Sequence, residues 1–573
     1  MESRKPYNGS SRKLIIAIDL GTTFSRISYC ILHPGIVPEI KGVTRFPAQE
    51  HVGSDAKIPT IIYYDKSEKP RAIGAEALQE HIVETAEDER WIKYVSFKLH
   101  LRPKSMLPPH MNENLPPLPA GKDLVAIFAD FYAYLFKCTK DFILESHQSA
   151  ASFWGTVENT IEFVLTHPNG WEGQQQAQMW KAVVRARLIP ENDEGQARVH
   201  FVTEGEASLH FCINHGLSSQ IKDDEAVVIV DAGGGTVDIS SYSTVPSTLA
   251  DCLAFEEVAV PQCHFTGSMF VTQRAREFVE KKLKGSKFSD EVNNIAECFD
   301  KTMKLHFRNS EEAAYVKFGS MRDKDPALDI RSGQLKLSGL VQSYIYSCML
   351  PTALFYSTDV ANFFEPSIAS IIKVIDAQRF ASSKTVSTVF LVGGFAASYW
   401  LFLKLQEHMT PLGISFSRPD SHVNKAVADG AVSMSTSFDG RKTEHKRRRE
   451  KSFLATDGVL TLGEQYSIIL PKDTRVSEET EFRQSYCRIQ TNLVDPTWMD
   501  VEQDMYPVLC NITADTEAVA KSLKLQRRAD GKTFFALEYD IILLFGRTKL
   551  KAQIAWEEGG VEKRGTARVV YNL

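Results

Sequence analysis

Two stretches of the sequence share one pattern: LIIAIDLGTT at residues 14–23 and VVIVDAGGGTVD at residues 227–238. In each, an apolar run typical of a buried strand ends in an aspartate, Asp19 or Asp231, and a turn rich in glycine and threonine follows. Glycine lets the backbone approach a ligand closely, and successive turn N–H groups form a concavity that binds anions. An aspartate beside such a turn commonly holds a divalent cation, directly or through water.

The pattern therefore indicates two turns that together hold a polyphosphate and its metal. The candidate phosphate-binding residues are Gly21, Thr22, Thr23, Gly233, Gly234, Gly235 and Thr236. A third apolar run ends in LVGGF at residues 391–395, where Gly393 and Gly394 would let a flat ring lie against bare backbone. Each segment taken alone also fits a plain β-turn. The repetition of the strand–aspartate–glycine unit within one chain favours the binding interpretation.

Length and composition are those of an ordinary globular protein. With 573 residues, 43% hydrophobic and 24% charged, the chain is neither collagen-like, mucin-like nor wholly disordered. A net charge of -6 lacks the basic excess of a dedicated nucleic-acid binder, so we expect no nucleic-acid partner. The nine cysteines are scattered and form no CxxC pair, which favours a reducing, cytoplasmic location and indicates no zinc site.

One segment is long and uncharged enough to need a membrane check, residues 385–403. A bilayer span needs about 20 apolar residues. The β-branched run, the Gly393–Gly394 pair and the amphipathic segment after them favour a strand, a turn and a helix instead. We therefore expect no membrane insertion. Residues 1–12 lack the apolar core of a signal peptide and are expected to be a flexible N-terminus.

Strand-like and helix-like segments alternate over residues 13–436, which predicts an α/β architecture. Strands are predicted at residues 14–19, 26–32, 60–64, 160–166, 198–203, 226–231 and 385–392, and helices at residues 122–147, 173–188, 290–306 and 360–380. The six prolines within residues 101–120 predict an extended loop.

The character of the sequence changes after residue 436. The run RKTEHKRRREK at residues 441–451 predicts an exposed linker over residues 437–451, although Lys446–Arg449 also fits a nuclear import patch. Beyond it, strand-like runs at residues 466–470, 482–490, 506–512, 534–544 and 567–571 predict a separate, mostly-β domain over residues 452–573.

These motifs resemble those of the actin/hexokinase/DnaK superfamily of ATPases, and within it the heat shock 70 kDa chaperone family. The likeness lies in AIDLGTTFSRIS, VVIVDAGGGTVDIS and VFLVGGFAASYW and covers roughly residues 13–436. It implies a two-lobed, actin-like ATPase domain, with lobe I at residues 13–225, lobe II at residues 226–436 and Mg-ATP in the cleft between them. It further implies that Asp19 and Asp231 orient water around Mg²⁺, that the two turns hold the phosphates of ATP or ADP, and that Gly393 and Gly394 back the adenosine.

The same resemblance extends to single residues elsewhere. Lys98 stands where the family has a lysine reaching the γ-phosphate, although a surface lysine is an equal alternative. Glu204 matches the glutamate near the attacking water, with Glu206 as a rival. Gly267 matches a glycine that precedes a lobe-II helix. Asp300 and Lys304 lie on the helix that contacts ribose and base.

The chain also departs from the family. Met303 stands where the common chaperones have lysine, Phe395–Tyr399 replaces the rest of the nucleoside turn, and a basic run replaces the apolar linker. IILPKDTRVSEETEF at residues 468–482 is similar to the start of the chaperone β-domain, but the tail is too short to add a helical lid. A lidless branch, of the heat shock 70 kDa protein 12 type, is the nearer match. It implies protein or peptide clients, and co-chaperones, as partners.

Three hypotheses follow for the function. The first is an ATP-binding and slowly ATP-hydrolysing chaperone-like protein, in which Glu204, Lys98, Asp19 and Asp231 carry the hydrolysis. The second is a nucleotide-gated scaffold that binds ATP without meaningful turnover. The third is a small-molecule kinase of the same superfamily, which the separate β-rich tail disfavours.

Overall fold

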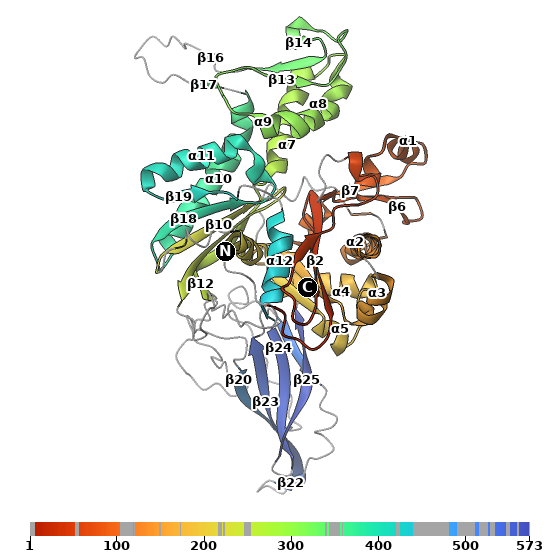
Figure 1. Ribbon diagram of the computed structural model, residues 1–573, viewed down its shortest axis with the longest axis vertical. Coiled ribbons are helices and arrows are strands. Elements are labelled where there is room, and N and C mark those ends of the chain that lie inside the picture. The colour runs from red at the N-terminus through yellow and green to blue at the C-terminus, as the bar shows by residue number, and fades with distance from the viewer. Residues whose placement is uncertain are drawn as a thin grey trace.

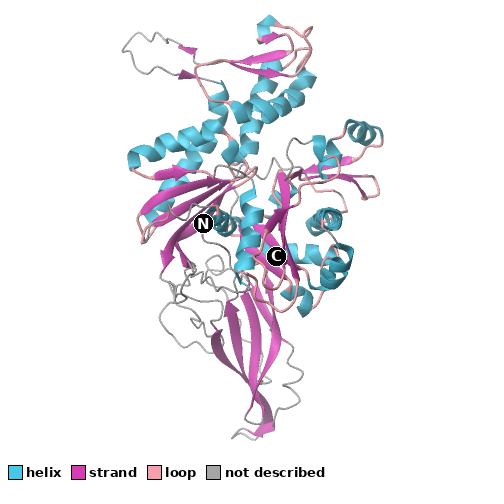
Figure 2. Ribbon diagram, viewed as in Figure 1, coloured by secondary structure: helices cyan, strands magenta, loops and turns pink. Residues whose placement is uncertain are grey.

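The protein is a mixed α/β structure with several separate sheets (Figure 1; Figure 2). A computed structural model describes residues 6–51, 57–102, 118–119, 121–147, 150–171, 173–215, 221, 224–245, 254–338, 341–342, 356–357, 359–419, 425–438, 481–489, 510–514, 525–527, 533–545, 550–558 and 561–571. Strand-and-helix alternation was expected over most of this length, and the α/β class is confirmed.

The first large sheet is built around the strand that ends in Asp19. Its strands lie in the order β3 (Ile40–Gly42), β2 (Phe24–Leu32), β1 (Lys13–Asp19), β8 (Glu162–His167) and β9 (Val199–Thr203), and β4 (Ile58–Pro59) pairs with β2. β1 runs antiparallel to β2 and parallel to β8. Leu14 and Ile16 of β1 pack in one core and Ile15 and Ala17 in another. Burial on both faces explains why this strand is a continuous apolar run.

The second large sheet repeats this arrangement around the strand that contains Asp231. Its order is β12 (Ala254–His264), β11 (Val237–Val245), β10 (Ala226–Ala232), β18 (Val386–Val392) and β19 (Ser415–Ser417). β10 runs antiparallel to β11 and parallel to β18, as β1 does to β2 and β8. The repeated sequence pattern therefore corresponds to a repeated strand environment.

Two helices lie between the large sheets. α6 (Glu204–Asn214) contacts β10 and α12 (Ala426–Phe438) contacts β1 and β2, and the two helices contact each other. Figure 1 shows α12 between β10 and β2. Gly430 of α12 permits this crossing, because a Cβ there would lie 1.8 Å from the backbone oxygen of Ala207. The crossing thus joins the two sheets through their aspartate-bearing strands.

The remaining helices lie outside the crossing of α6 and α12 (Figure 1). They are α1 (Glu80–Asp88), α2 (Leu124–Ser146), α3 (Ala150–Val157), α4 (Gln174–Arg185), α5 (Asp193–Ala197), α7 (Ser268–Leu283), α8 (Val292–Cys298), α9 (Lys304–His306), α10 (Asp359–Ala381) and α11 (Tyr399–Met409). The predicted helix over residues 290–306 is interrupted, because Phe299–Met303 (η8) forms a π-helical turn between α8 and α9. Among the described residues, no helix is both long and apolar enough to cross a membrane.

Smaller sheets complete the structure. One has the order β6 (Pro70–Ile73), β5 (Ile61–Tyr64), β7 (Ile92–Val95), a second has β13 (Ala314–Lys317), β15 (Gln334–Leu337), β14 (Ile330–Arg331), and β16 (Val341–Gln342) pairs with β17 (Tyr356–Ser357). Near the C-terminus the order is β20 (Glu481–Ile489), β23 (Thr533–Phe545), β24 (Leu550–Glu558), β25 (Val561–Tyr571) and β21 (Cys510–Ala514), with β22 (Leu525–Arg527) on β23. The described residues beyond 480 are thus all strands.

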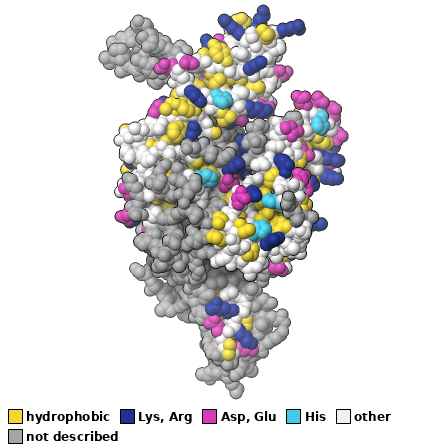
Figure 3. Space-filling view, viewed as in Figure 1, with side chains coloured by type: hydrophobic (Ala, Val, Ile, Leu, Met, Phe, Trp, Pro, Cys, Tyr) yellow, Lys and Arg dark blue, Asp and Glu magenta, His cyan; other side chains and the backbone are white. Residues whose placement is uncertain are grey.

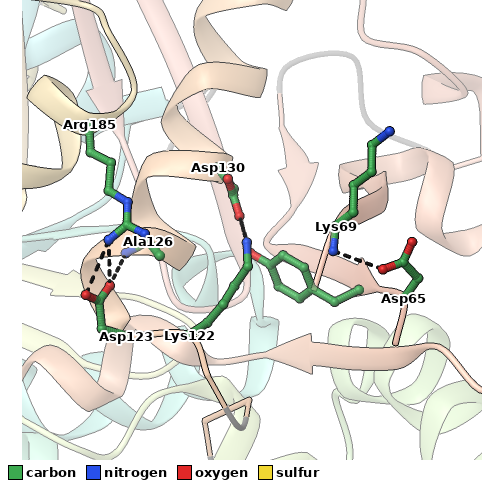
Figure 4. Close-up of polar contacts among 8 residues, drawn as sticks. Asp65, Lys69, Lys122, Asp123, Ala126, Asp130 and Arg185 are labelled. Carbon is green, nitrogen blue, oxygen red and sulfur yellow. Dashed lines mark hydrogen bonds and ion pairs between the residues drawn. The ribbon is translucent and has the colours of Figure 1, made fainter. Parts of the chain in front are cut away.

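Polar contacts hold α2 against the β5–β6 hairpin and against α4 (Figure 4). The Asp123 carboxylate caps α2 by accepting from the Ala126 amide, and the Arg185 guanidinium of α4 donates to it as well. Asp130, about two turns further along α2, accepts from both Lys122 and the Tyr64 hydroxyl of β5. In the hairpin turn, the Lys69 amide donates to Asp65. The Tyr64–Asp130 bond thus joins the hairpin to α2, and the Asp65–Lys69 bond holds the hairpin turn itself.

Some expectations from the sequence are corrected or lie outside the described residues. Tyr7 is buried and its amide donates to the Ile36 carbonyl at 2.9 Å, so the expected flexible N-terminus is anchored at this point. Residues 385–403 form β18, a turn and the start of α11, as predicted. Residues 103–117 and 439–480, which include most of the predicted proline-rich loop, the basic run and the strand at 466–470, lie outside the described part.

Opposite charges collect on separate parts of the visible surface (Figure 3). Exposed cations lie on and around the β13–β15 sheet: Lys317, Arg322, Lys324, Arg331 and Lys336. Acidic residues dominate α1, which carries Glu80, Glu84, Glu87 and Asp88. None of the candidate site residues belongs to either surface.

Candidate functional site

The two glycine–threonine turns lie directly against each other. A Cβ added to Gly234 would lie 2.0 Å from the Thr23 hydroxyl oxygen, and one added to Gly235 would lie 2.6 Å from that of Thr22. Only glycine allows this approach, because real Cβ atoms do not come so close to other heavy atoms. The fold therefore brings together two turns that are about 210 residues apart in the sequence.

The second turn is held in place by the start of α7. The amides of Gly267, Ser268 and Met269 donate to the carbonyls of Gly235, Gly233 and Gly234, at 3.2, 3.1 and 2.9 Å. Gly267 must be glycine here, because its Cβ would lie 2.5 Å from the Gly234 oxygen. Within the turn, the Gly233 amide donates to the Thr236 carbonyl.

These bonds leave two donors of the second turn available. The turn carbonyls are engaged by α7, whereas the amides of Gly234 and Gly235 have no hydrogen-bond acceptor among the described residues. Backbone amides of this kind bind phosphate oxygens. Gly267, predicted from the resemblance, thus acts on the site by supporting the turn.

Asp19 and Asp231 lie close enough to influence each other. Asp19 accepts from the Thr166 hydroxyl at 3.0 Å, and Asp231 accepts from the Ser208 hydroxyl at 2.8 Å. Burial raises the pKa of Asp231 to about 8, and the charges of Glu204 and Asp19 add to this rise. Two carboxylates that repel each other in a buried site favour a cation between them.

The residues present fit magnesium held mainly through water and phosphate. In the described part of the chain, no group of three or more His, Cys, Asp or Glu side chains could enclose a metal ion. Mg²⁺ does not require such a cage, because it commonly uses one or two carboxylates together with substrate phosphates and water. Asp19 and Asp231 would be those two carboxylates.

Lys98 and Glu204 form a buried ion pair beside the turns. Lys98 Nζ lies 2.6 Å from Glu204 Oε1, and their side chains are 5% and 10% exposed. Burial alone would lower the pKa of Lys98, but the charges of Glu204 and Asp19 outweigh it and raise that pKa. The surface-lysine alternative for Lys98 is therefore wrong. Glu204 follows the N-cap Thr203 of α6, where the helix dipole stabilises a carboxylate.

The rival assignment, Glu206, has a different role. Its carboxylate accepts from the amide and hydroxyl of Thr203, which in turn caps the Glu206 amide. This reciprocal capping box fixes the start of α6. Glu206 therefore helps to set the position of Glu204, which is the carboxylate that Lys98 contacts.

The third glycine pair lies next to Asp231. Gly393 has a φ of +91°, and a Cβ there would lie 2.3 Å from Asp231 Oδ1. A Cβ on Gly394 would meet no atom within 4 Å, so the backbone at Gly394 faces open space. The structure thus connects the end of β18 to the aspartate of β10.

Asp300 lies within the π-helical turn and forms an ion pair with Lys304, the residue that follows the turn. The Lys304 ammonium also donates to the Thr272 hydroxyl of α7 at 3.1 Å. Both residues lie within electrostatic range of Lys57: burial is the main cause that lowers the pKa of Lys57, the charges of Arg26 and Lys304 lower it further, and Asp300 opposes this. Segments with a π turn are frequent at functional sites. Lys57 in turn contacts the Phe24 ring beside the first turn, so Asp300 and Lys304 lie within electrostatic range of a residue at that turn.

The sequence reasoning missed several residues of this site. Ser208 and Thr166 bond the two aspartates, and Arg26 and Lys57 bring two cations near them. Arg26 alone had a sequence signal, since it interrupts an apolar strand three residues after Thr23. The other residues come from distant segments that only the fold brings together.

A pocket of about 400 Å³ lies beside the helix crossing. Its lining includes Phe211 and Asn214 of α6, and Asp429 and Ser433 of α12. None of the predicted site residues lines it. Asp429 links the pocket to the first sheet, since it accepts from the Ser28 hydroxyl of β2 at 2.5 Å.

Comparison with known proteins gives no further guide to the chemistry: no protein-family model and no curated protein matches the chain. The site itself offers two apposed turns with free amides and hydroxyls, two carboxylates and a buried lysine–glutamate pair. Such a set can bind a polyphosphate, position a water molecule and stabilise charge on a phosphoryl group.

Proposed function

We propose that this chain is an ATP-binding, slowly ATP-hydrolysing, chaperone-like protein whose binding of protein clients is regulated by nucleotide. The observation that carries the proposal is the direct contact of Thr22 and Thr23 with Gly234 and Gly235. Two strand–aspartate–glycine turns that meet from two similar sheets are what a nucleotide cleft between two lobes requires. The two-lobed, actin-like ATPase arrangement is part of this proposal.

The chain's residues divide the work of hydrolysis. The turn amides and threonine hydroxyls bind the phosphates, and Glu204 orients water for in-line attack on the γ-phosphate. Lys98, held 2.6 Å from Glu204, offsets the charge that develops on the transferred group. Bound Mg²⁺, held by Asp19 and Asp231 through water, would neutralise phosphate charge. Asp300, Lys304, Gly393 and Gly394 would contact the nucleoside.

Nucleotide entry requires the turns to separate. Because Thr23 and Gly234 are in contact, no phosphate fits between them in this arrangement. The sheets are joined by the crossing of α6 and α12, where Gly430 contacts Ala207 closely. A small rotation about this crossing would open the turns. This rotation is also how nucleotide would alter a client-binding surface elsewhere in the chain, such as the C-terminal strands.

A nucleotide-gated scaffold without turnover is the second candidate. The observations that favour it are the altered nucleoside turn at Phe395–Tyr399 and the basic run that stands in place of the chaperone family's apolar linker. We place the protein in the cytoplasm, with access to the nucleus through Lys446–Arg449 as the alternative use of the basic run.

Binding of Mg-ATP to Asp231→Ala, measured by isothermal titration calorimetry, tests the proposal. We expect the variant to lose most of the Mg-dependent part of its ATP affinity, up to about tenfold or about 1.4 kcal/mol. Asp329→Ala is the matched control, because Asp329 pairs with Lys282 at 2.8 Å away from the turns. Equal affinity of wild type and Asp231→Ala would contradict the site assignment.

Single-turnover phosphate release from Glu204→Gln separates the two candidates. The ATPase proposal expects normal ATP binding and slower hydrolysis, because the amide keeps the shape of Glu204 but cannot act on water as a carboxylate does. Unchanged hydrolysis would remove this role from Glu204. If the wild type binds ATP tightly but shows no measurable hydrolysis, the nucleotide-gated scaffold is the function that remains.

A further inference from the structure

The strand that leaves the first turn carries a buried arginine that has no role in the mechanism above. Arg26 of β2 lies directly opposite Asp19 of β1 in the antiparallel ladder. Directly opposite residues point to the same face of a sheet, so the guanidinium shares the face of Asp19. Ser28, two residues further on and on this same face, bonds Asp429 of α12. Arg26 therefore points into the space between the first sheet and α12.

Among the described residues, the guanidinium has carboxylates around it but no bonded partner. Arg26 is 8% exposed, and its Nε is buried without a hydrogen-bond partner. No carboxylate of the described residues lies within ion-pair distance of it. Burial lowers the pKa of Arg26 to about 10, while Asp19, Asp429 and Asp231 oppose this change. Arg26 thus stays charged at neutral pH, near carboxylates from three different elements.

A second cation faces the same space. The Lys57 ammonium lies 4.1 Å from the ring centroid of Phe24, the residue after Thr23. Among the described residues it has no carboxylate partner. Arg26 and Lys304 are both near enough to lower the pKa of Lys57. Two like charges that have no bonded anion among the described residues, beside a turn with available amides, favour binding of an anion in this space.

We propose that Arg26 is a fixed cation of the nucleotide site, which binds the polyphosphate directly and supports nucleotide binding without a divalent metal. The inference rests on the proposed function. It adds a residue that binds phosphate and the expectation that nucleotide binding depends only weakly on the metal. Arginine suits this role better than Lys57, because its planar fork binds phosphate through two hydrogen bonds and stays charged when buried. Mg²⁺ on Asp19 and Asp231 would then assist binding but would not be required for it.

The experiment measures affinity for ATP and for inorganic tripolyphosphate, each in Mg²⁺ and in EDTA, for wild type and Arg26→Gln. We expect wild type to lose no more than about tenfold in affinity for ATP on removal of Mg²⁺. Arg26→Gln should lose a further ~10- to 100-fold in EDTA, the worth of a charge-assisted hydrogen bond. Arg26→Lys should recover part of this loss, and adenosine affinity should not change. Arg276→Gln, which removes an exposed arginine bonded to Asn293, is the matched control.

Thermal unfolding without nucleotide separates a binding role from a structural one. Because Arg26 is buried without a bonded partner, Arg26→Gln should unfold at the same or a higher temperature than wild type. A large fall in that temperature, or equal ATP affinity of wild type and Arg26→Gln in EDTA, would overturn the inference. If wild type binds ATP only in Mg²⁺, the inference fails and the proposed function stands. If it binds ATP in neither condition, both fail.

Discussion

Replacing Lys98 by methionine should destabilise the protein strongly, because it leaves Glu204 as a buried carboxylate without its counter-ion. The two side chains are 5% and 10% exposed and 2.6 Å apart. Removal of one member of such a pair costs about 3–5 kcal/mol. The same substitution at Lys137, whose pair with Asp141 is 72% and 51% exposed, should cost no more than about 0.5 kcal/mol. Both lysines contact a carboxylate within 3 Å, so burial is the main difference between them.

The pair can be isolated by a double-mutant cycle. Glu204→Gln alone leaves Lys98 charged but still near Asp19, and Lys98→Met/Glu204→Gln removes both charges. We expect the double variant to lose about 2–4 kcal/mol less free energy of unfolding than the two single variants lose when their losses are added. The loss in Lys98→Met should shrink as the pH falls, because burial raises the pKa of Glu204 and the orphaned carboxylate takes up a proton.

Denaturant unfolding followed by tryptophan fluorescence measures these differences. Trp171 is a local reporter, since its ring centroid lies 5.9 Å from Lys98 Nζ. Additive losses in the cycle, within about 0.5 kcal/mol, would refute a buried ion pair. A loss in Lys98→Met as small as that in Lys137→Met would do the same.

Three further predictions concern stability in the ligand-free, metal-free protein. Between pH 4 and 8 native Asp231 holds a proton that the unfolded chain lacks, so the free energy of unfolding should fall as pH rises, by at most about 1.4 kcal/mol per pH unit. Unfolding curves measured across this pH range should lack this slope in Asp231→Asn. Gly393→Ala, at φ +91° and against Asp231, should lower the melting temperature, whereas Gly394→Ala, in open space, should leave it unchanged and weaken ATP binding; equal melting temperatures would contradict this geometry. Gly430→Ala should destabilise the protein by about 1–3 kcal/mol, because the added Cβ meets a backbone carbonyl of α6, whereas Gly155→Ala, at a helical glycine with free space, should stabilise it by up to about 1 kcal/mol. The opposite order of stabilities in denaturant unfolding would argue against a tight helix crossing.

The sequence by itself predicted the elements that local pattern controls. The apolar runs that end in Asp19 and Asp231 form β1 and β10, and the helical spacing after Lys122 forms α2. Strand and helix period, burial on both faces and turn chemistry are local properties, so they are visible in a single sequence. The helix over residues 290–306 was predicted too simply, because the spacing of apolar residues does not reveal the π-helical turn that interrupts it at Phe299–Met303.

Only the tertiary structure decided which predicted residues meet. It placed Lys98 in a buried pair with Glu204, gave Glu206 to a helix cap, and set Thr22 and Thr23 against Gly234 and Gly235. It also revealed Arg26 and Lys57 as two cations that have no bonded anion in the described part of the chain. The physical reason is that contact, burial and charge depend on distances between segments far apart in the chain. A local pattern specifies each strand and turn, but not which strand or turn it will face.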